Sequence, residues 1–192
     1  MKGRRPLTEI AQESWNAFLQ PGDWAIDATA GNGFDTLFLA RSVSPGGRVF
    51  SIDIQQGAIE ATGKRLDENG LLESVSLIKG DHSGMRDYLG CGARGRVSLV
   101  CFNLGYLPTG DHAITTRPET TIAALHESLL LLKPEGALSV VAYRGHEGAM
   151  EEAESVERFF TTLPKPWECR QMVNSGTTEH PGPVWWLAAQ GG

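Results

Sequence analysis

The sequence predicts an α/β fold with a seven-stranded, mostly parallel sheet, an antiparallel C-terminal strand and helices on both faces. Short apolar runs alternate with segments of helical periodicity along most of the chain, which favours parallel strands joined by crossover helices. The last two apolar runs are joined only by residues 174–183, which leaves no room for a helix, so this pair is expected to be antiparallel. With 192 residues, 41% of them hydrophobic, the chain is long enough for one domain with a full core.

The elements follow in order along the chain. A helix is predicted over 8–19, where apolar residues recur near helical spacing, and Pro21 and Gly22 end it. Strands and helices then alternate, with strands at 24–29, 48–53, 75–79 and 96–102 and helices at 35–43, 56–69, 83–89 and 117–132. The run LKPEGALSVVAY predicts a turn and a buried strand. In the next helix, 149–162, a solvent-facing side is marked by Glu151, Glu152, Glu154 and Glu157.

The end of the chain differs from this alternation. Residues 167–173 and 184–189 are strand-like and form a predicted hairpin. We therefore expect a single domain over 1–192, made of an N-terminal helix (1–20), a cofactor-binding core (24–143) and a C-terminal β-hairpin (166–189).

Composition and charge restrict the class of protein. The longest apolar runs are far shorter than the ~20 residues of a membrane span, and the first residues lack the apolar core of a secretory signal, so a cytoplasmic protein without membrane contact is expected. A net charge of −6 argues against a nucleic-acid binder with a large basic surface, but not against a local basic face. Cys91, Cys101 and Cys169 are widely spaced without CxxC spacing, so neither a metal site nor a disulfide framework is expected.

The most informative segment is 24–36, WAIDATAGNGFDT, where an apolar strand meets a glycine-rich turn and a helix start. Gly31 and Gly33 allow backbone angles closed to other residues and let the main chain approach a ligand closely. Asp27 ends the strand, where it can accept a hydrogen bond from an ammonium group or a ribose hydroxyl. Gly-x-Gly turns also occur in plain connections, so the turn alone leaves a purely structural role open.

Three further positions indicate a nucleotide-like ligand. Asp53 ends the second strand, where this architecture places a ribose-binding carboxylate. Asp35 and Thr36 form the cap region of the next helix, whose free N–H groups point back over the strand end. Thr36 also replaces the third glycine of the dinucleotide-binding pattern, and the terminal hairpin has no counterpart in that fold, so a dehydrogenase fits less well.

The complete pattern resembles the class I S-adenosylmethionine-dependent methyltransferases, which have a Rossmann-like fold with a reversed last strand. DATAGNG is similar to their first cofactor motif and IDI to their second. GDH after the third strand is similar to their adenine-side position, and LLKPEGAL to their turn into the fifth strand. The resemblance implies S-adenosylmethionine as the cofactor.

The run 102–111, FNLGYLPTGD, follows the fourth strand and carries the most specific signal. Methyltransferases that act on amino nitrogens place an Asn or Asp there, followed by a turn and an aromatic residue. The nitrogen must be held in line with the sulfonium methyl group, and such positioning contributes roughly 7–11 kcal/mol in favourable cases. Asn103 and the Leu104 carbonyl can accept hydrogen bonds from the amine, and Tyr106 can pack against the substrate. Their structural alternatives are a turn cap for Asn103 and a packed loop aromatic for Tyr106.

The strings NLGYLPTGDHAITT, DATAGNG, SIDIQ and VVAYRGHEG together resemble a bacterial family long labelled putative rRNA methylases. Its members are understood as methyltransferases that complete the methylaminomethyl group on the wobble uridine of certain tRNAs. The resemblance implies that the tRNA anticodon loop is the partner, and that the catalytic site consists of Asn103, Leu104, Gly105 and Tyr106. The expected cofactor-binding residues are Asp27, Thr29, Gly31, Asn32, Gly33, Asp35, Thr36, Asp53, Ile54, Gln55, Asp81, His82 and Asn103.

The substrate is expected to meet side chains around the methyl-transfer site. These residues are Tyr106, Asp111, Thr115, Thr116, Tyr143, Arg144 and His146. The structural alternatives are a helix cap for the two threonines, a solvated loop position for Asp111 and a satisfied structural histidine for His146. The chain has Phe34 where the family's first motif has a His, and the 174–183 loop matches the family only loosely.

The first hypothesis is therefore a methyltransferase that N-methylates the aminomethyl group of the tRNA wobble uridine, on uridine or 2-thiouridine. An anticodon loop is single-stranded, and its wobble base can turn outward into a pocket, so no large basic surface is required. A ribosomal RNA methyltransferase or a small-molecule methyltransferase is the alternative enzyme. A non-catalytic cofactor-binding module is an alternative of another class, although it has no need of the Asn-Leu-Gly-Tyr turn. The oligomeric state, a homodimer included, stays open.

Overall fold

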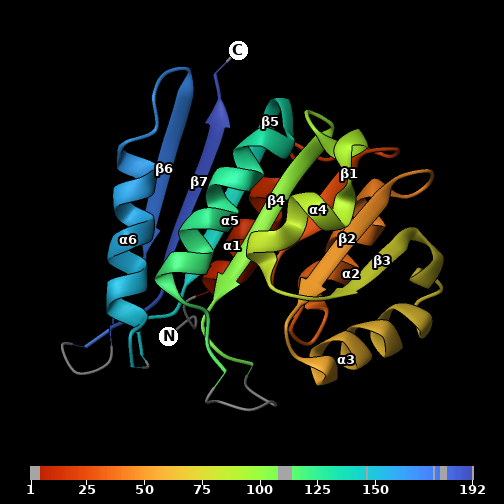
Figure 1. The fold of residues 1–192 in the computed structure, drawn as a ribbon, viewed down its shortest axis with the longest axis horizontal. Helices are drawn as coiled ribbons and strands as arrows, with labels where there is room; N and C mark the ends of the chain where they lie inside the picture. The colour runs from red at the N-terminus through yellow and green to blue at the C-terminus, as the bar shows by residue number, and fades with distance from the viewer. Residues whose placement is uncertain (1–4, 108–113, 146, 175, 178–180, 192) are drawn as a thin grey trace.

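The computed structural model describes residues 5–107, 114–145, 147–174, 176–177 and 181–191. Within these residues seven strands form one sheet in the order β3-β2-β1-β4-β5-β7-β6 (Figure 1). Their bounds are Trp24–Asp27 (β1), Arg48–Asp53 (β2), Val75–Lys79 (β3), Val97–Leu104 (β4), Leu132–Ala142 (β5), Trp167–Val173 (β6) and Val184–Gln190 (β7).

Helices cover both faces of this sheet, as the alternation predicted. The helices α1, α2 and α3 lie on one face, and α4, α5 and α6 lie on the other (Figure 1). Their buried apolar side chains belong to two separate clusters, one for each group of helices. The helices are Leu7–Trp15 (α1), Phe34–Val43 (α2), Gln56–Asp67 (α3), Met85–Leu89 (α4), Pro118–Leu131 (α5) and Ala149–Thr161 (α6), with short 3₁₀ helices at Leu72–Ser74, His82–Gly84 and Cys91–Ala93.

The direction of the C-terminal strands confirms the predicted hairpin. β1, β2, β3, β4 and β5 pair in parallel, whereas β7 pairs antiparallel with both β5 and β6. The hairpin arises because the 174–183 connection is too short to carry the chain back along the sheet. The predicted mostly parallel sheet with a reversed last strand is thus confirmed.

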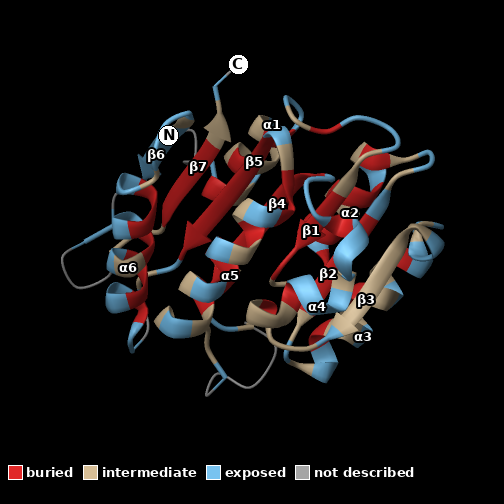
Figure 2. Ribbon diagram, turned by 45° about the horizontal axis from the view of Figure 1, so that its top comes forward, coloured by how far each residue is buried: buried red, intermediate tan, exposed pale blue. Residues whose placement is uncertain are grey.

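The core lies on both sides of the central strands. Ile26 in β1, Val100 in β4 and Leu138 in β5 have no exposed surface, and Trp186 in β7 is only 3% exposed. Figure 2 shows these strands as buried, whereas β6 at the sheet edge is largely exposed. Because β1 and β4 are buried on both faces, the centre of the sheet is a rigid support for the loops that follow them.

The strand order creates a switch point beside β1. The chain leaves β1 through α2 on one face, and it enters β4 from α4 on the other face. Connections that diverge in this way leave a crevice outside the carboxyl ends of the strands, which is the usual ligand site of open α/β sheets. Among the helices in the described ranges, none has both the length and the apolar composition that a bilayer crossing requires.

The predicted C-terminal ends of β1, β4 and α1 were wrong, and the ends of β1 and β4 lie near the crevice. β1 ends at Asp27 rather than 29, because the Thr29 N–H donates to the Asp27 carboxylate and turns the chain. β4 continues to Leu104 rather than 102, so Asn103 belongs to the sheet and pairs with Val141. α1 ends at Trp15 rather than 19, where the Phe18 N–H closes a tighter turn on the Trp15 carbonyl.

The predicted turn before β5 is present inside the strand as an irregularity. Leu132 pairs with Val97, but Ala137 pairs with Leu99, so the residues between them bulge out of the ladder. Glu135 has a positive φ of 65° there. A Cβ on Gly136 would lie 3.0 Å from the Val97 carbonyl oxygen, which explains a glycine at this close approach.

The expectation that Glu152 lies on the solvent-facing side of α6 was wrong. Glu151, Glu154 and Glu157 are exposed as predicted, but Glu152 is only 2% exposed. Helical spacing from Ala149 and Val156, both buried, places Glu152 on the apolar side of the helix.

Candidate active site

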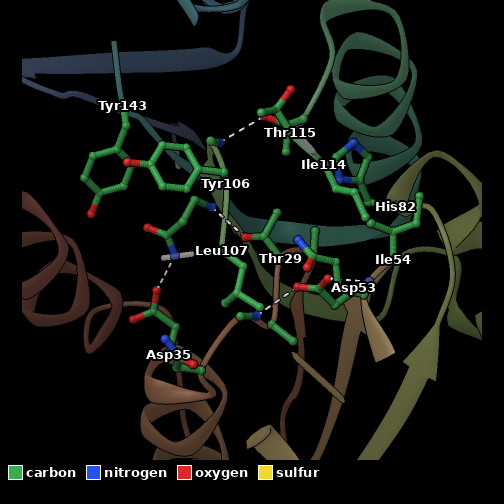
Figure 3. A pocket seen from close by; sticks show the side chains of 18 of the residues that line it. Thr29, Asp35, Asp53, Ile54, His82, Tyr106, Leu107, Ile114, Thr115 and Tyr143 are labelled. Atoms are coloured by element: carbon green, nitrogen blue, oxygen red, sulfur yellow. Dashed lines mark hydrogen bonds between the residues drawn. The ribbon is translucent and has the colours of Figure 1, made fainter. Parts of the chain in front are cut away.

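A cavity of about 970 Å³ lies at the carboxyl ends of the central strands (Figure 3). This volume is at the upper end of the ~300–1,000 Å³ range of ligand sites, enough for a cofactor and part of a second molecule. Most of the predicted site residues lie on its wall: Thr29, Gly31, Asn32, Asp35, Asp53, Ile54, Gln55, Asp81, His82, Asn103, Gly105, Tyr106, Thr115, Thr116, Tyr143 and Arg144. Asp111 and His146 lie outside the described residues.

Asp27 and Thr36 lie behind the wall instead, contrary to the expected direct contact of both with a cofactor. Asp27 has no exposed surface and accepts hydrogen bonds from Thr36 Oγ1 at 2.6 Å and from the Thr29 N–H at 3.2 Å. Burial, reinforced by the nearby charge of Asp35, raises the pKa of Asp27 to about 7. The two side chains therefore fix the strand-to-helix turn from beneath.

Gly33 and Leu104 also do not line the cavity. Gly33 has a φ of 75°, and a Cβ there would lie 2.8 Å from the Thr62 Cα, so a glycine is required where the turn meets α3. Leu104 has no exposed surface, and its carbonyl accepts a hydrogen bond from the Tyr143 N–H at 3.1 Å. The carbonyl expected to accept from a substrate amine thus joins β4 to the end of β5.

The glycine turn is tied to β2 by Asp53. Asp53 Oδ2 accepts from the Gly31 N–H and Oδ1 accepts from the Gln55 N–H, both at 2.9 Å. Each carboxylate oxygen keeps a further lone pair, so the group can still accept hydrogen bonds from a ribose. Beside it Ile54 is 52% exposed, which leaves an apolar surface on which a flat base can rest.

Phe34 forms the outer edge of the same turn. Its ring is 62% exposed, and the Arg65 guanidinium lies 3.8 Å from the ring centroid. Arg65 Nε also donates to the Asn32 carbonyl at 2.7 Å. At this position, where the resemblance implied a His, Phe34 therefore joins the turn to α3 through a cation–π contact.

His82 provides a test of whether the wall fits a nucleoside. Its ring is 8% exposed and packs edge-on against Phe102. Burial lowers the pKa of His82, so the imidazole is neutral at pH 7. Among the described residues its buried Nε2 has no hydrogen-bond partner, although His82 lines the cavity. An unpaired buried polar atom is costly, so this atom fits a site completed by a bound ligand.

The other end of the cavity is built around Asp35. Figure 3 shows Asp35, Tyr106 and Tyr143 on one side and Asp53, Ile54 and His82 on the other. Asp35 Oδ1 accepts from Gln12 Nε2 and Oδ2 accepts from Asn103 Nδ2, each at 2.5 Å. Burial raises the pKa of Asp35, although the two amide donors act in the opposite direction.

Asn103 is held at both its backbone and its side chain. Its N–H donates to Thr29 Oγ1 at 2.7 Å, which joins the ends of β4 and β1. Because its amide nitrogen donates to Asp35, its Oδ1 is the side-chain atom left to accept from a substrate. The predicted orientation of an amine by this side chain is compatible with that geometry.

The turn after β4 is closed by the predicted threonines. The Gly105 N–H donates to Thr116 Oγ1 at 2.9 Å, the Thr116 N–H donates to the Gly105 carbonyl at 3.0 Å, and Tyr106 forms an isolated antiparallel bridge with Thr115. The rings of Tyr106 and Tyr143 are 42% and 45% exposed. Two aromatic surfaces therefore face the cavity near Asn103.

Two wall residues, Thr8 and Gln12, were not among those predicted from the sequence. Thr8 and Gln12 line the cavity from α1. They lie one helical turn apart beside the buried stripe that contains Ala11, and this polar i,i+4 pair was a readable signal of a functional edge.

A family model matches residues 49–187 of the chain, and the family is described as "Putative rRNA methylase". A chloroplastic tRNA (mnm5s2U34)-methyltransferase from Arabidopsis thaliana is 44% identical over 183 residues, which are 90% of this chain and 66% of that protein. The chain thus spans less than two thirds of that relative's length.

Two solved structures that are similar to this chain are also described as methylases or methyltransferases. A crystal structure described as a putative rRNA-methylase from Clostridium thermocellum has a TM-score of 0.89 and 38% identity, covering 99% of this chain and 100% of that chain. A methyltransferase structure from Streptococcus mutans in complex with SAH has a TM-score of 0.84 and 27% identity, covering 98% and 99%. The predicted Rossmann-like methyltransferase fold is confirmed, and the chain belongs to the family described as "Putative rRNA methylase".

Proposed function

We propose that the protein is an S-adenosylmethionine-dependent methyltransferase that N-methylates the aminomethyl group of the tRNA wobble uridine. The observation that carries the proposal is the hydrogen bond between Asp35 in α2 and Asn103 at the end of β4, on the wall of a cavity large enough for a cofactor and a nucleotide. The tRNA methyltransferase that is 44% identical supports the substrate, and the SAH-bound neighbour supports the cofactor.

The cofactor would occupy the side of the cavity that contains Asp53. Asp53 would accept hydrogen bonds from the ribose, Ile54 would contact one face of the adenine, and His82 would offer Nε2 at its edge. When bound, S-adenosylmethionine supplies the electrophilic methyl group. Thr29 and Asn103, which are hydrogen bonded to each other and line the cavity between its two ends, would hold the part of the cofactor that carries this methyl group.

Asp35 and Asn103 would bind the acceptor nitrogen. An alkylamine reaches the enzyme mostly as an ammonium ion and must lose one proton before its lone pair can attack. Asp35 would attract the ammonium and accept that proton, while Asn103 Oδ1 accepts from a remaining N–H and orients the lone pair. Attack by the neutral nitrogen would form the N–C bond as the S–C bond breaks, and the products would be S-adenosylhomocysteine and the methylated amine as its ammonium ion. The proton on Asp35 afterwards returns to solvent.

The uridine base itself would contact the two tyrosines. Tyr106 and Tyr143 present exposed rings beside Asn103, and bases that leave a single-stranded loop are commonly held by stacking on aromatic side chains. Arg144 also lines the cavity and supplies positive charge in a chain of net charge −6. Recognition of one extruded nucleotide explains how an acidic protein can act on RNA.

Ribosomal RNA is the second candidate substrate, because the family description favours it. The deciding experiment incubates the purified protein and labelled S-adenosylmethionine with tRNA that carries aminomethyl uridine, with the same tRNA unmodified, and with ribosomal RNA. We expect methylaminomethyl uridine only in the first reaction, identified by nucleoside mass spectrometry. Label in ribosomal RNA alone would assign the enzyme to the alternative. Bulk tRNA from a strain without the gene should accumulate the aminomethyl precursor.

A further inference from the structure

Glu152 is a buried acid that lies outside the cavity wall. It belongs to α6 and is 2% exposed. Burying a carboxylate is costly unless its oxygens accept hydrogen bonds. Here Oε1 accepts from Thr121 Oγ1 in α5, and Oε2 accepts from Thr116 Oγ1, both at 2.6 Å. The carboxylate therefore connects α6 to both α5 and the segment before α5.

Thr116 links this buried acid to the turn after β4. A threonine hydroxyl has one hydrogen, and here Thr116 donates it to Glu152. Its oxygen is thereby oriented to accept from the Gly105 N–H at 2.9 Å. Donation to a carboxylate polarises the hydroxyl and strengthens the bond that it accepts. A chain of hydrogen bonds thus runs from Gly105 through Thr116 to Glu152.

Gly105 lies between the two residues that contact the acceptor in the proposed function. It has a positive φ of 152°, a conformation that glycine permits, and it has no side chain that could hold the turn by packing. Asn103 is fixed by its own contacts with Thr29 and Asp35, so the contacts of the Gly105 backbone set the path of the chain from there to Tyr106. Those contacts are the Thr116 hydroxyl and the Thr116 N–H.

We propose that Glu152 is a positioning residue for methyl transfer, which holds the Asn103–Tyr106 turn in register through the Thr116 hydroxyl. The role rests on the proposed function, because the turn is the part of the site that holds the acceptor. The proposed ribose side is held by a separate contact, in which Asp53 accepts from the Gly31 N–H. Loss of Glu152 should therefore lower kcat and leave cofactor affinity unchanged.

The test compares Glu152→Ala with Thr121→Val. Both changes remove one partner from the same buried cluster, but only Glu152→Ala removes the acceptor for Thr116. Glu152→Gln, which keeps an acceptor oxygen, is the conservative variant. We expect kcat to fall by about 10²-fold in Glu152→Ala, as for misplaced reacting groups. Glu152→Gln should recover most of that loss, and Thr121→Val should retain wild-type kcat. The affinity for SAH, measured by calorimetry, should stay unchanged in all three.

Amide hydrogen exchange of residues 103–107 is a second readout that does not depend on turnover. Exchange should accelerate in Glu152→Ala and not in Thr121→Val, at a temperature where both variants are folded. Equal exchange in the two variants, or equal kcat, would overturn the positioning role. If the wild-type protein does not methylate aminomethyl tRNA, the proposed function fails, while the exchange comparison still decides whether Glu152 holds the turn.

Discussion

Asn103 Nδ2 and Asp35 Oδ2 are 2.5 Å apart and hydrogen bonded, although 68 positions separate the two residues in the chain. The bond joins the end of β4 to the first turn of α2. It therefore places an amide oxygen and a buried carboxylate next to each other at the head of the same cavity.

Asp35→Asn should abolish proton acceptance while keeping the size of the side chain. We expect the methyl-transfer rate in a single turnover to fall by about 10²- to 10⁴-fold, the usual contribution of a positioned general base. SAH affinity should change little, because Asp53 and His82 lie on the opposite side of the cavity (Figure 3). Glu60→Gln in α3, which lies outside the cavity wall, is the control and should keep the wild-type rate. A rate for Asp35→Asn within about threefold of wild type would remove Asp35 from the mechanism.

The free energy of unfolding should decrease as the pH rises toward 7, because Asp27 has a raised pKa in the folded protein. Burial and the charge of Asp35 raise its pKa from 3.8 to about 7. The folded state therefore keeps a proton that the unfolded chain releases at lower pH, so the stabilisation is complete below pH 3.8 and is lost as the pH rises to about 7. Asp27→Asn does not titrate, so its free energy of unfolding in urea should lack this part of the decline.

Asp67→Asn is the matched control for that measurement, because Asp67 is an exposed acid at the end of α3. It should reproduce the wild-type dependence of stability on pH. A slope that is the same for Asp27→Asn and the wild-type protein would show that Asp27 does not hold its proton in the folded state.

Asp53→Asn should weaken cofactor binding. The change removes a charged acceptor that fixes the Gly31 and Gln55 N–H groups and is free to accept from a ribose as well. Hydrogen bonds to charged groups contribute about 1.5–3 kcal/mol, so the Kd for SAH should rise by roughly 10- to 150-fold. Calorimetry with SAH measures this directly, and Asp67→Asn should bind like the wild-type protein. Unchanged affinity would mean that the cofactor does not contact this carboxylate.

Tyr106→Ala and Tyr143→Ala should weaken RNA binding and not cofactor binding. Stacking of a base on an aromatic ring contributes about 1–3 kcal/mol, so each change should raise KM for the tRNA by roughly 5- to 150-fold. Met172→Ala is a control, because Met172 is similarly exposed, at 41%, but lies on the edge strand β6. If both tyrosine variants keep the wild-type KM, the base is held elsewhere.

Local sequence patterns predicted the order of the strands and helices, and the family resemblance added many residues of the cavity wall. An apolar run such as β1 has one stable arrangement in water, which is burial in a sheet, and Gly31 and Gly33 mark the turn because both adopt positive φ. The carboxyl ends of parallel strands meet at one edge of the sheet, which is why Asp53, His82 and Asn103, singled out by motif and by resemblance, lie near one another. The cavity wall contains all three.

Contacts between distant elements were not readable from these patterns. Asp27 and Asp35 are both acids in the same motif, yet only the folded chain places Asp27 behind the wall and Asp35 on it. Glu152 follows Glu151 in the sequence, but the position of α6 against α5 determines that Glu152 meets Thr116 and Thr121. The residue types and their order determine the fold and the strand ends at which the motifs of the proposed cofactor and acceptor sites lie. The tertiary structure decides which acidic side chains are buried from solvent and which hydrogen-bond partners they have, because burial and hydrogen bonding depend on residues far away in the chain.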